Sequence, residues 1–133
     1  KEISVFGGEQ LRPNIHIFDM SRAYHYLINA EKKEVSGQIF NAGYENQTVN
    51  HLASLVKKVI GEDVKIKQFS SDDNRSYHIS SDKIKKNLGF TTKKTIEDAI
   101  RDLKNAFDTK ILDKTLTNEK YFNIKRMNNL KLK

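Results

Sequence analysis

Two arginine-containing segments hold the side chains of this sequence that are best suited to binding an anion. Residues 7–19 contain Arg12, and residues 72–80 contain Arg75. A planar guanidinium can donate two parallel hydrogen bonds to phosphate oxygens and keeps its charge at physiological pH. A glycine pair at the start of the first segment would let a ligand approach the backbone closely. The segments predict a site for a phosphorylated ligand, and the alternative is that both arginines are ordinary exposed side chains.

Two further side chains are candidates for the same site. Tyr77 lies just after Arg75 in an extended segment, where its ring could stack on a ligand or simply pack against the core. His16 alternates with apolar residues along the chain, so it either lines a pocket or lies between structural layers. The four histidines lack the spacing of a ligand pair with a third ligand nearby, so no metal site is predicted.

The sequence contains no complete set of catalytic residues. It has no Gly-x-Gly-x-x-Gly turn, no phosphate-loop lysine motif and no Ser-His-Asp arrangement. Tyr121 and Lys125 have a tyrosine–lysine spacing used in some oxidoreductases, but this spacing arises easily by accident in a lysine-rich chain. Asp19 is interpreted as a helix N-cap rather than as a catalytic acid. The adjacent Asp72 and Asp73 point apart in an extended loop and make a poor acid–base pair.

The elements that must position these side chains follow from apolar spacing and turn residues. Short strands are predicted at residues 3–6, 38–41 and 64–67, and residues 14–18 are predicted to be extended. Helix N-caps are predicted at Asp19, Thr48, Ser80 or Ser81, and Thr95. This order predicts the α/β class, with a small sheet of short strands covered by helices.

Glycines and apolar stripes define the helices further. Gly61 and Gly89 are predicted to end the second and third helices. In the last helix Ile96, Leu103 and Phe107 are among the side chains predicted to face inward. Beyond this helix the periodicity fades, so residues 110–133 are expected to be a loosely packed or partner-dependent tail.

Length and charge limit the classes of protein to which the chain can belong. It has 133 residues, of which 24 are Lys or Arg and 17 are Asp or Glu, giving a formal net charge of +7. This length predicts one domain with a core of its own. The charge permits nucleic-acid binding, but the lysines are dispersed rather than interleaved with aromatic residues, which disfavours it. The absence of cysteine, of a signal peptide and of a long apolar run predicts a cytoplasmic protein without membrane contact.

Several runs of the sequence, taken together and in order, carry a family resemblance. They are residues 7–20, 39–43, 73–84 and 88–90. The chain resembles the C-terminal part of the NAD-dependent nucleotide-sugar epimerases and dehydratases, which are extended short-chain dehydrogenases with a Rossmann-type fold. The similarity covers about residues 1–108, which are expected to form a nucleotide-sugar-binding lobe, and residues 109–133 form a basic tail.

The resemblance implies roles for individual residues. Arg12 and Arg75 match family positions that contact the diphosphate of a nucleoside diphosphate sugar. Tyr77 matches a position near the sugar or nucleotide, and Gln10 and His16 match loop positions whose contact with the ligand varies. In the family, an N-terminal Rossmann domain holds NAD and the catalytic tyrosine–lysine pair, and neither is found in this sequence.

The resemblance therefore implies a part of an enzyme that is inactive on its own. The full-length enzyme is expected to be a homodimer that acts through a 4-keto sugar, with NAD bound outside this chain. Two alternatives remain open: a basic nucleic-acid-binding module, and a structural domain that packs on a partner and binds no ligand.

Overall fold

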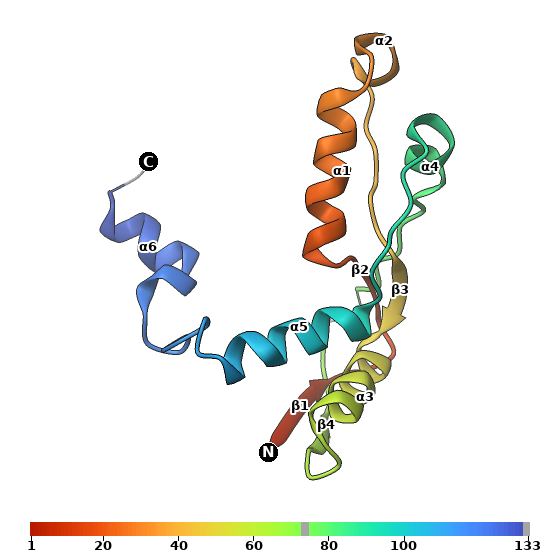
Figure 1. The fold of residues 1–133 in the computed structure, drawn as a ribbon. Helices are drawn as coiled ribbons and strands as arrows, with labels where there is room; N and C mark the ends of the chain where they lie inside the picture. The colour runs from red at the N-terminus through yellow and green to blue at the C-terminus, as the bar shows by residue number, and fades with distance from the viewer. Residues whose placement is uncertain (73–74, 132–133) are drawn as a thin grey trace. The chain divides into compact units, whose positions relative to one another are not determined.

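A computed structural model of the protein describes residues 1–72 and 75–131 (Figure 1). Asp73 and Asn74, which belong to the second arginine segment and to the family resemblance, lie outside the described residues. The chain divides into two compact units, Lys1–Arg101 and Asp102–Lys133. The predicted division into a binding lobe at residues 1–108 and a tail at residues 109–133 stays a prediction.

The first unit contains two short two-stranded sheets. Strand β1 (Glu2–Phe6) pairs in parallel with β4 (Lys65–Phe69), and β2 (Leu11–Asn14) pairs antiparallel with β3 (Glu45–Thr48). At the end of the parallel pair, the rings of Phe6 and Phe69 stack with their centroids 5.3 Å apart. With helices beside these strands, the predicted α/β class is confirmed.

The strand predicted at residues 38–41 is wrong for the structure described. Residues 38–43 form neither helix nor strand. Phe40 and Ala42 pack against the core, whereas the Ile39 side chain is 83% exposed. A strand exists only where a neighbouring strand completes its hydrogen-bond ladder. Here the Ile39 carbonyl instead accepts a hydrogen bond from Lys83 Nζ at 2.9 Å.

Helix α1 (Ile17–Asn29) begins earlier than predicted. His16 is its N-cap, and the Nδ1 atom of His16 accepts a hydrogen bond from the Phe18 amide at 3.0 Å. The predictions that Asp19 caps this helix and that residues 17 and 18 are extended are therefore wrong. An imidazole nitrogen can accept from the first turn as a hydroxyl or carboxylate does, which frees Asp19 for other contacts.

Four further helices follow, namely α2 (Lys32–Val35), α3 (Val49–Ile60), α4 (Asp82–Leu88) and α5 (Ile96–Asp108). Helix α2 was not predicted from the sequence, the other three lie where their caps and glycines predicted them, and α5 runs from the first unit into the second. Thr48 Oγ1 caps α3 by accepting from the His51 amide at 3.1 Å, and Thr95 Oγ1 accepts from the Asp98 amide at 3.1 Å in the first turn of α5. Helix α3 ends at Gly61, and α4 ends at Gly89, whose φ of 67° lies in the left-handed region open to glycine.

The core of the first unit lies between α1, α4 and the segments that flank them. Ala23, Ile84 and Phe90 are buried together, and the Tyr26 ring meets the Phe90 ring edge-on. In α5 only Ile96 is buried. The Leu103 and Phe107 side chains are 54% and 51% exposed. The prediction that these two side chains face inward is wrong.

The second unit has little interior of its own. It contains the end of α5 from Asp102 onward, a 3-10 turn, η1 (Glu119–Tyr121), and the short helix α6 (Asn123–Asn129). None of its described residues is buried. In the part of the chain that the structure describes, no helix is both long enough and apolar enough to span a membrane.

Candidate functional site

The fold brings the two arginine segments together, although they are far apart in the sequence. Arg12 lies on β2, and its Nη1 atom donates to the Arg75 carbonyl oxygen at 2.7 Å across a separation of 63 residues. The Arg12 guanidinium carbon also lies 5.4 Å from the centre of the Tyr77 ring. Three of the five predicted ligand-binding residues are therefore neighbours.

Backbone contacts with β2 place the second segment beside Arg12. The Tyr77 amide donates to the Leu11 carbonyl at 3.0 Å, and the Leu11 amide donates to Ser76 Oγ at 2.9 Å. The Arg12 guanidinium and the Tyr77 ring can attract each other, since a cation favours the face of an aromatic ring. The Tyr77 side chain is nevertheless 49% exposed, so one part of its ring stays open to solvent.

Gln10 folds back on the glycine turn. Its Oε1 atom accepts from the Gly8 amide at 2.5 Å, and its Nε2 atom donates to the Phe6 carbonyl at 2.8 Å. A Cβ atom placed on Gly7 would meet the Gln10 amide group at 2.9 Å, and one placed on Gly8 would overlap the Asn50 side chain. The glycines therefore make room for the chain's own side chains. This turn does not fit a dinucleotide cofactor, because the Gln10 and Asn50 side chains fill the space beside the glycines and the Gly8 amide already donates to Gln10.

His16 is buried rather than open to a ligand. Its side chain is only 4% exposed, and its Nδ1 atom is used by the first turn of α1. Of the two interpretations left open by the sequence, the structure places His16 inside the fold. A contact of Gln10 or His16 with a ligand stays a prediction.

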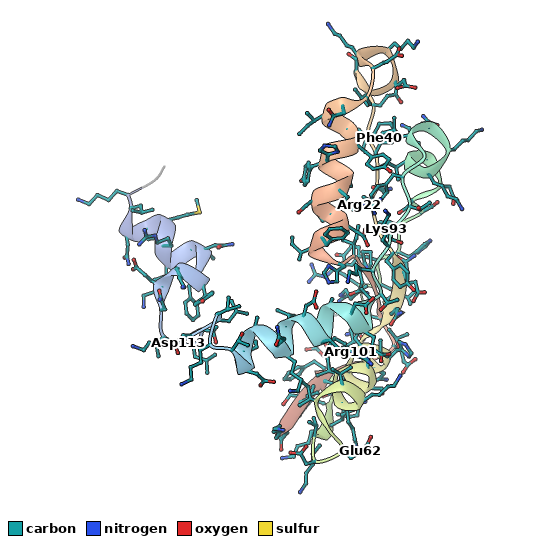
Figure 2. All side chains as sticks on the ribbon, viewed as in Figure 1. Arg22, Phe40, Glu62, Lys93, Arg101 and Asp113 are labelled. Atoms are coloured by element: carbon teal, nitrogen blue, oxygen red, sulfur yellow. The ribbon has the colours of Figure 1, made fainter. Side chains whose placement is uncertain are left out.

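An ion pair that sequence reasoning missed anchors the start of α1. Asp19 is fully buried, and its Oδ1 atom accepts from Arg22 Nη1 at 2.6 Å. Its Oδ2 atom accepts from the Lys93 and Lys94 amides at 2.9 and 2.8 Å. Figure 2 shows Arg22 on α1 and Lys93 close to it. The spacing of Asp19 and Arg22, three residues apart on a helix, was the one signal available in the sequence.

The environment of Asp19 determines its charge. Burial raises the pKa of Asp19, but the hydrogen bonds from the Lys94 amide, Arg22 and the Lys93 amide outweigh it and hold the pKa below its usual value. Arg22 also donates to the Thr91 carbonyl at 3.0 Å. The carboxylate therefore stays ionised and ties α1 to the segment that leads into α5.

A polar cavity of about 450 Å³ lies next to the cross-strand partner of Arg12. Its lining includes Tyr44, Gln47 and His51, and Gln47 faces Arg12 in the register of β2 and β3. Burial and the nearby Glu45 carboxylate raise the pKa of Tyr44, which stays a neutral phenol. Gln47 Oε1 is buried and has no hydrogen-bond partner among the residues that the structure describes. The sequence offered no signal for this cavity.

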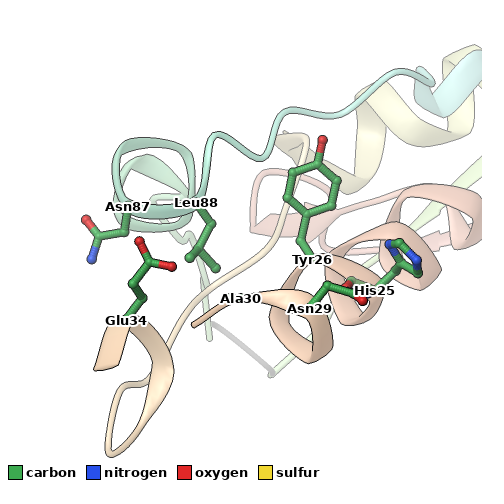
Figure 3. A pocket seen from close by; sticks show the side chains of 7 residues that line it. All are labelled: His25, Tyr26, Asn29, Ala30, Glu34, Asn87 and Leu88. Atoms are coloured by element: carbon green, nitrogen blue, oxygen red, sulfur yellow. The ribbon is translucent and has the colours of Figure 1, made fainter. Parts of the chain in front are cut away.

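A second cavity, of about 400 Å³, lies between α1, α2 and α4 (Figure 3). It is lined by His25, Tyr26, Asn29, Ala30, Glu34, Asn87 and Leu88. None of the predicted site residues lines it. Asn29 already donates to the His25 carbonyl, and Glu34 accepts from the Glu31 amide. Within residues 1–72 and 75–131, no group of three or more acidic or histidine side chains is placed to hold a metal ion.

Comparison by sequence and comparison by structure give different results. No protein-family model matches the sequence, and a search of curated proteins finds no significant match. Solved structures do match, so the similarity lies in the three-dimensional arrangement of the chain.

Three of these structures show the range of the similarity. UDP-glucuronic acid 4-epimerase from Bacillus cereus, solved with UDP-glucuronic acid and NAD, has a TM-score of 0.71 at 18% identity, over 82% of this chain and 36% of that one. dTDP-glucose 4,6-dehydratase from Bacillus anthracis, solved with NAD, has a TM-score of 0.68 at 19% identity, over 94% and 38%. L-threonine dehydrogenase from Clostridium difficile has a TM-score of 0.70 at 16% identity, over 83% and 37%.

The similarity covers most of this chain but only part of each solved structure. This chain spans little more than a third of the length of each of these structures. The resemblance predicted from the sequence is confirmed at the level of the fold. The chain therefore has the fold of one part of these solved epimerase, dehydratase and dehydrogenase structures.

Proposed function

We propose that this chain is the nucleoside-diphosphate-sugar-binding part of an NAD-dependent epimerase or dehydratase. The observation that carries the proposal is the contact between the two arginine segments, in which Arg12 donates to the Arg75 carbonyl and lies beside Tyr77. Fold alone does not decide the substrate, since L-threonine dehydrogenase shares it. The arginine pair supports a phosphorylated ligand.

The residues of this chain would bind and orient the ligand. Arg12 carries five N–H donors, so those not directed at carbonyl oxygens can reach a phosphate. Arg75 adds a second positive charge from the neighbouring segment, and the exposed part of the Tyr77 ring offers a surface for stacking. Binding energy gathered at the diphosphate would hold the sugar in a reactive position.

The chemistry itself belongs to parts of the enzyme outside this chain. In the full-length enzyme, a Rossmann domain would hold NAD as hydride acceptor, and the sugar would pass through a 4-keto intermediate. Within this chain, the glycine turn at Gly7 and Gly8 does not fit NAD, since the space beside it is filled by Gln10 and Asn50. We further propose that the full-length enzyme is a homodimer and that this chain is inactive on its own.

Calorimetric titration of the full-length protein with UDP and with dTDP tests the proposal. Arg12→Ala and Arg75→Ala should each weaken binding by about 1.5–3 kcal/mol, since each removes a charge-assisted contact. Arg126→Ala is the matched control, because Arg126 pairs with Glu119 in the second unit. Unchanged affinity in both site variants would exclude the proposed role of the two arginines.

A further inference from the structure

The segment at residues 75–81 is held in place by side chains rather than by a strand ladder. It forms neither helix nor strand, yet it carries Arg75 and Tyr77. At its centre, the Asn46 side chain binds both backbone groups of Ile79. Asn46 Nδ2 donates to the Ile79 carbonyl at 2.9 Å, and the Ile79 amide donates to Asn46 Oδ1 at 2.9 Å.

Asparagine is the side chain suited to this contact on β3. Its planar amide offers a donor and an acceptor side by side, as a peptide group of a neighbouring strand does. An aspartate would keep only the acceptor, and an alanine would keep neither. Without Asn46, both polar backbone groups of Ile79 would lose their partner in a partly buried place.

Contacts at both ends of the segment fix its position along β2 and β3. Before Ile79, Ser76 and Tyr77 bind the backbone of Leu11. After Ile79, Ser81 Oγ accepts from the Gly43 amide at 2.8 Å. A Cβ atom placed on Gly43 would lie only 2.8 Å from Ile79 Cδ1, so the segment packs closely against the chain that leads into β3.

We propose that Asn46 is a positioning residue for ligand binding, which acts by holding the 75–81 segment so that Arg75 and Tyr77 face the ligand. This inference rests on the proposed function. A segment already held in its binding conformation loses less conformational freedom when the ligand binds. Asn46 therefore raises affinity through Arg75 without touching the ligand.

Hydrogen exchange in the full-length protein tests the first half of the proposal without any ligand. Asn46→Ala should speed exchange of the Ile79 amide by about tenfold, since the amide loses its acceptor. Asn46→Asp should leave this amide protected, because the acceptor oxygen remains. Asn29→Ala is the control, as Asn29 makes a comparable side-chain bond within α1. Unchanged exchange at Ile79 in Asn46→Ala would overturn the proposal.

A double-mutant cycle with UDP, or with dTDP if that is the nucleotide bound, tests the second half. Asn46→Ala should weaken binding by about fivefold in the wild-type background and by clearly less in the Arg75→Ala background, where only Tyr77 is left to position. Asn46→Asp should fall between the wild type and Asn46→Ala. An equal loss in both backgrounds would mean that Asn46 does not act through Arg75, and would overturn the proposal even if Asn46→Ala also lowers stability.

The two proposals fail in different ways. If the wild-type protein binds neither UDP nor dTDP, the proposed function is overturned, and the ligand role of Asn46 falls with it. If the wild type binds and Asn46→Ala binds equally well, only the role of Asn46 is overturned.

Discussion

At the scale of single residues, the structure separates polar side chains that are open to solvent from those that hold the fold. Arg12 and Tyr77 are partly exposed and adjacent, whereas Asp19 is fully buried and accepts three hydrogen-bond contacts from the chain around it. A buried carboxylate with such partners is stable only while it is ionised. Asp19 is therefore the residue whose change should affect stability most directly.

We expect Asp19→Asn to lower the free energy of unfolding at pH 7 by about 1.5–3 kcal/mol, since hydrogen bonds to a charged group are lost. The control is Asp63→Asn, which removes an exposed ion pair with Lys1 and should change stability by less than about 1 kcal/mol. Urea unfolding of the three proteins measures both values. Equal effects of the two substitutions would contradict the role given to Asp19.

The same residue predicts a dependence of stability on pH. Because the pKa of Asp19 is lower in the folded chain, its contribution is fully present above the pKa of an unfolded aspartate, about 3.9. The contribution is lost as the pH falls through the lower, folded pKa. Unfolding measured from pH 7 down to pH 2 should therefore show a smaller decline in Asp19→Asn than in the wild type. A parallel decline in both proteins would be the contrary result.

At the scale of elements, local capping sets where the helices begin, and contacts distant in sequence set where the segments lie. Thr48 ends β3 and caps α3, so one residue joins the strand that carries Asn46 to the helix that follows. Helix α3 in turn packs on β1, β3 and β4. A change at this cap should reach both sheets.

Thr48→Ala should lower the free energy of unfolding by about 1 kcal/mol, because the His51 amide loses its acceptor. Thr91→Ala is the matched control, since Thr91 is exposed and its contact with Arg22 is made by its carbonyl. Thermal unfolding followed by circular dichroism compares the two variants. If Thr48→Ala were as stable as Thr91→Ala, the cap would contribute nothing.

At the scale of the whole molecule, the two compact units differ in what holds them. The Lys1–Arg101 unit has a buried cluster around Ala23, Ile84 and Phe90, whereas the described part of Asp102–Lys133 buries no residue. Apolar burial is the main stabilising term in folding. The first unit should therefore determine the stability of the chain.

Ending the chain after Asp108 should change the free energy of unfolding of the first unit by less than about 1 kcal/mol. The measurement is urea unfolding of the 133-residue chain and the shortened chain under the same conditions. A larger loss would show that the tail stabilises the first unit.

The isolated chain should not convert a nucleotide sugar. With NAD added, chromatography of UDP-glucose or dTDP-glucose should show no product, because we propose that NAD is held by a domain outside this chain. The full-length protein is the positive control. Turnover by the isolated chain would contradict the proposed division of labour.

Features that depend on neighbours along the chain could be read from the amino-acid sequence. Thr48, Thr95, Gly61 and Gly89 mark helix ends through hydrogen bonds and backbone angles within a few residues, so their positions could be predicted correctly. The family resemblance also indicated the fold, because an ordered set of runs reflects a shared arrangement.

Features that depend on partners far away in the sequence emerged only from the folded chain. Asp19 has the residue type of a cap, but its Oδ2 partners lie 74 and 75 residues further on, and His16 takes the capping place. Residues 38–41 have the apolar pattern of a strand but pair with no strand among the described residues. The meeting of Arg12 with Arg75, and the binding of Ile79 by Asn46, likewise follow from how β2 and β3 pack, which no local pattern encodes.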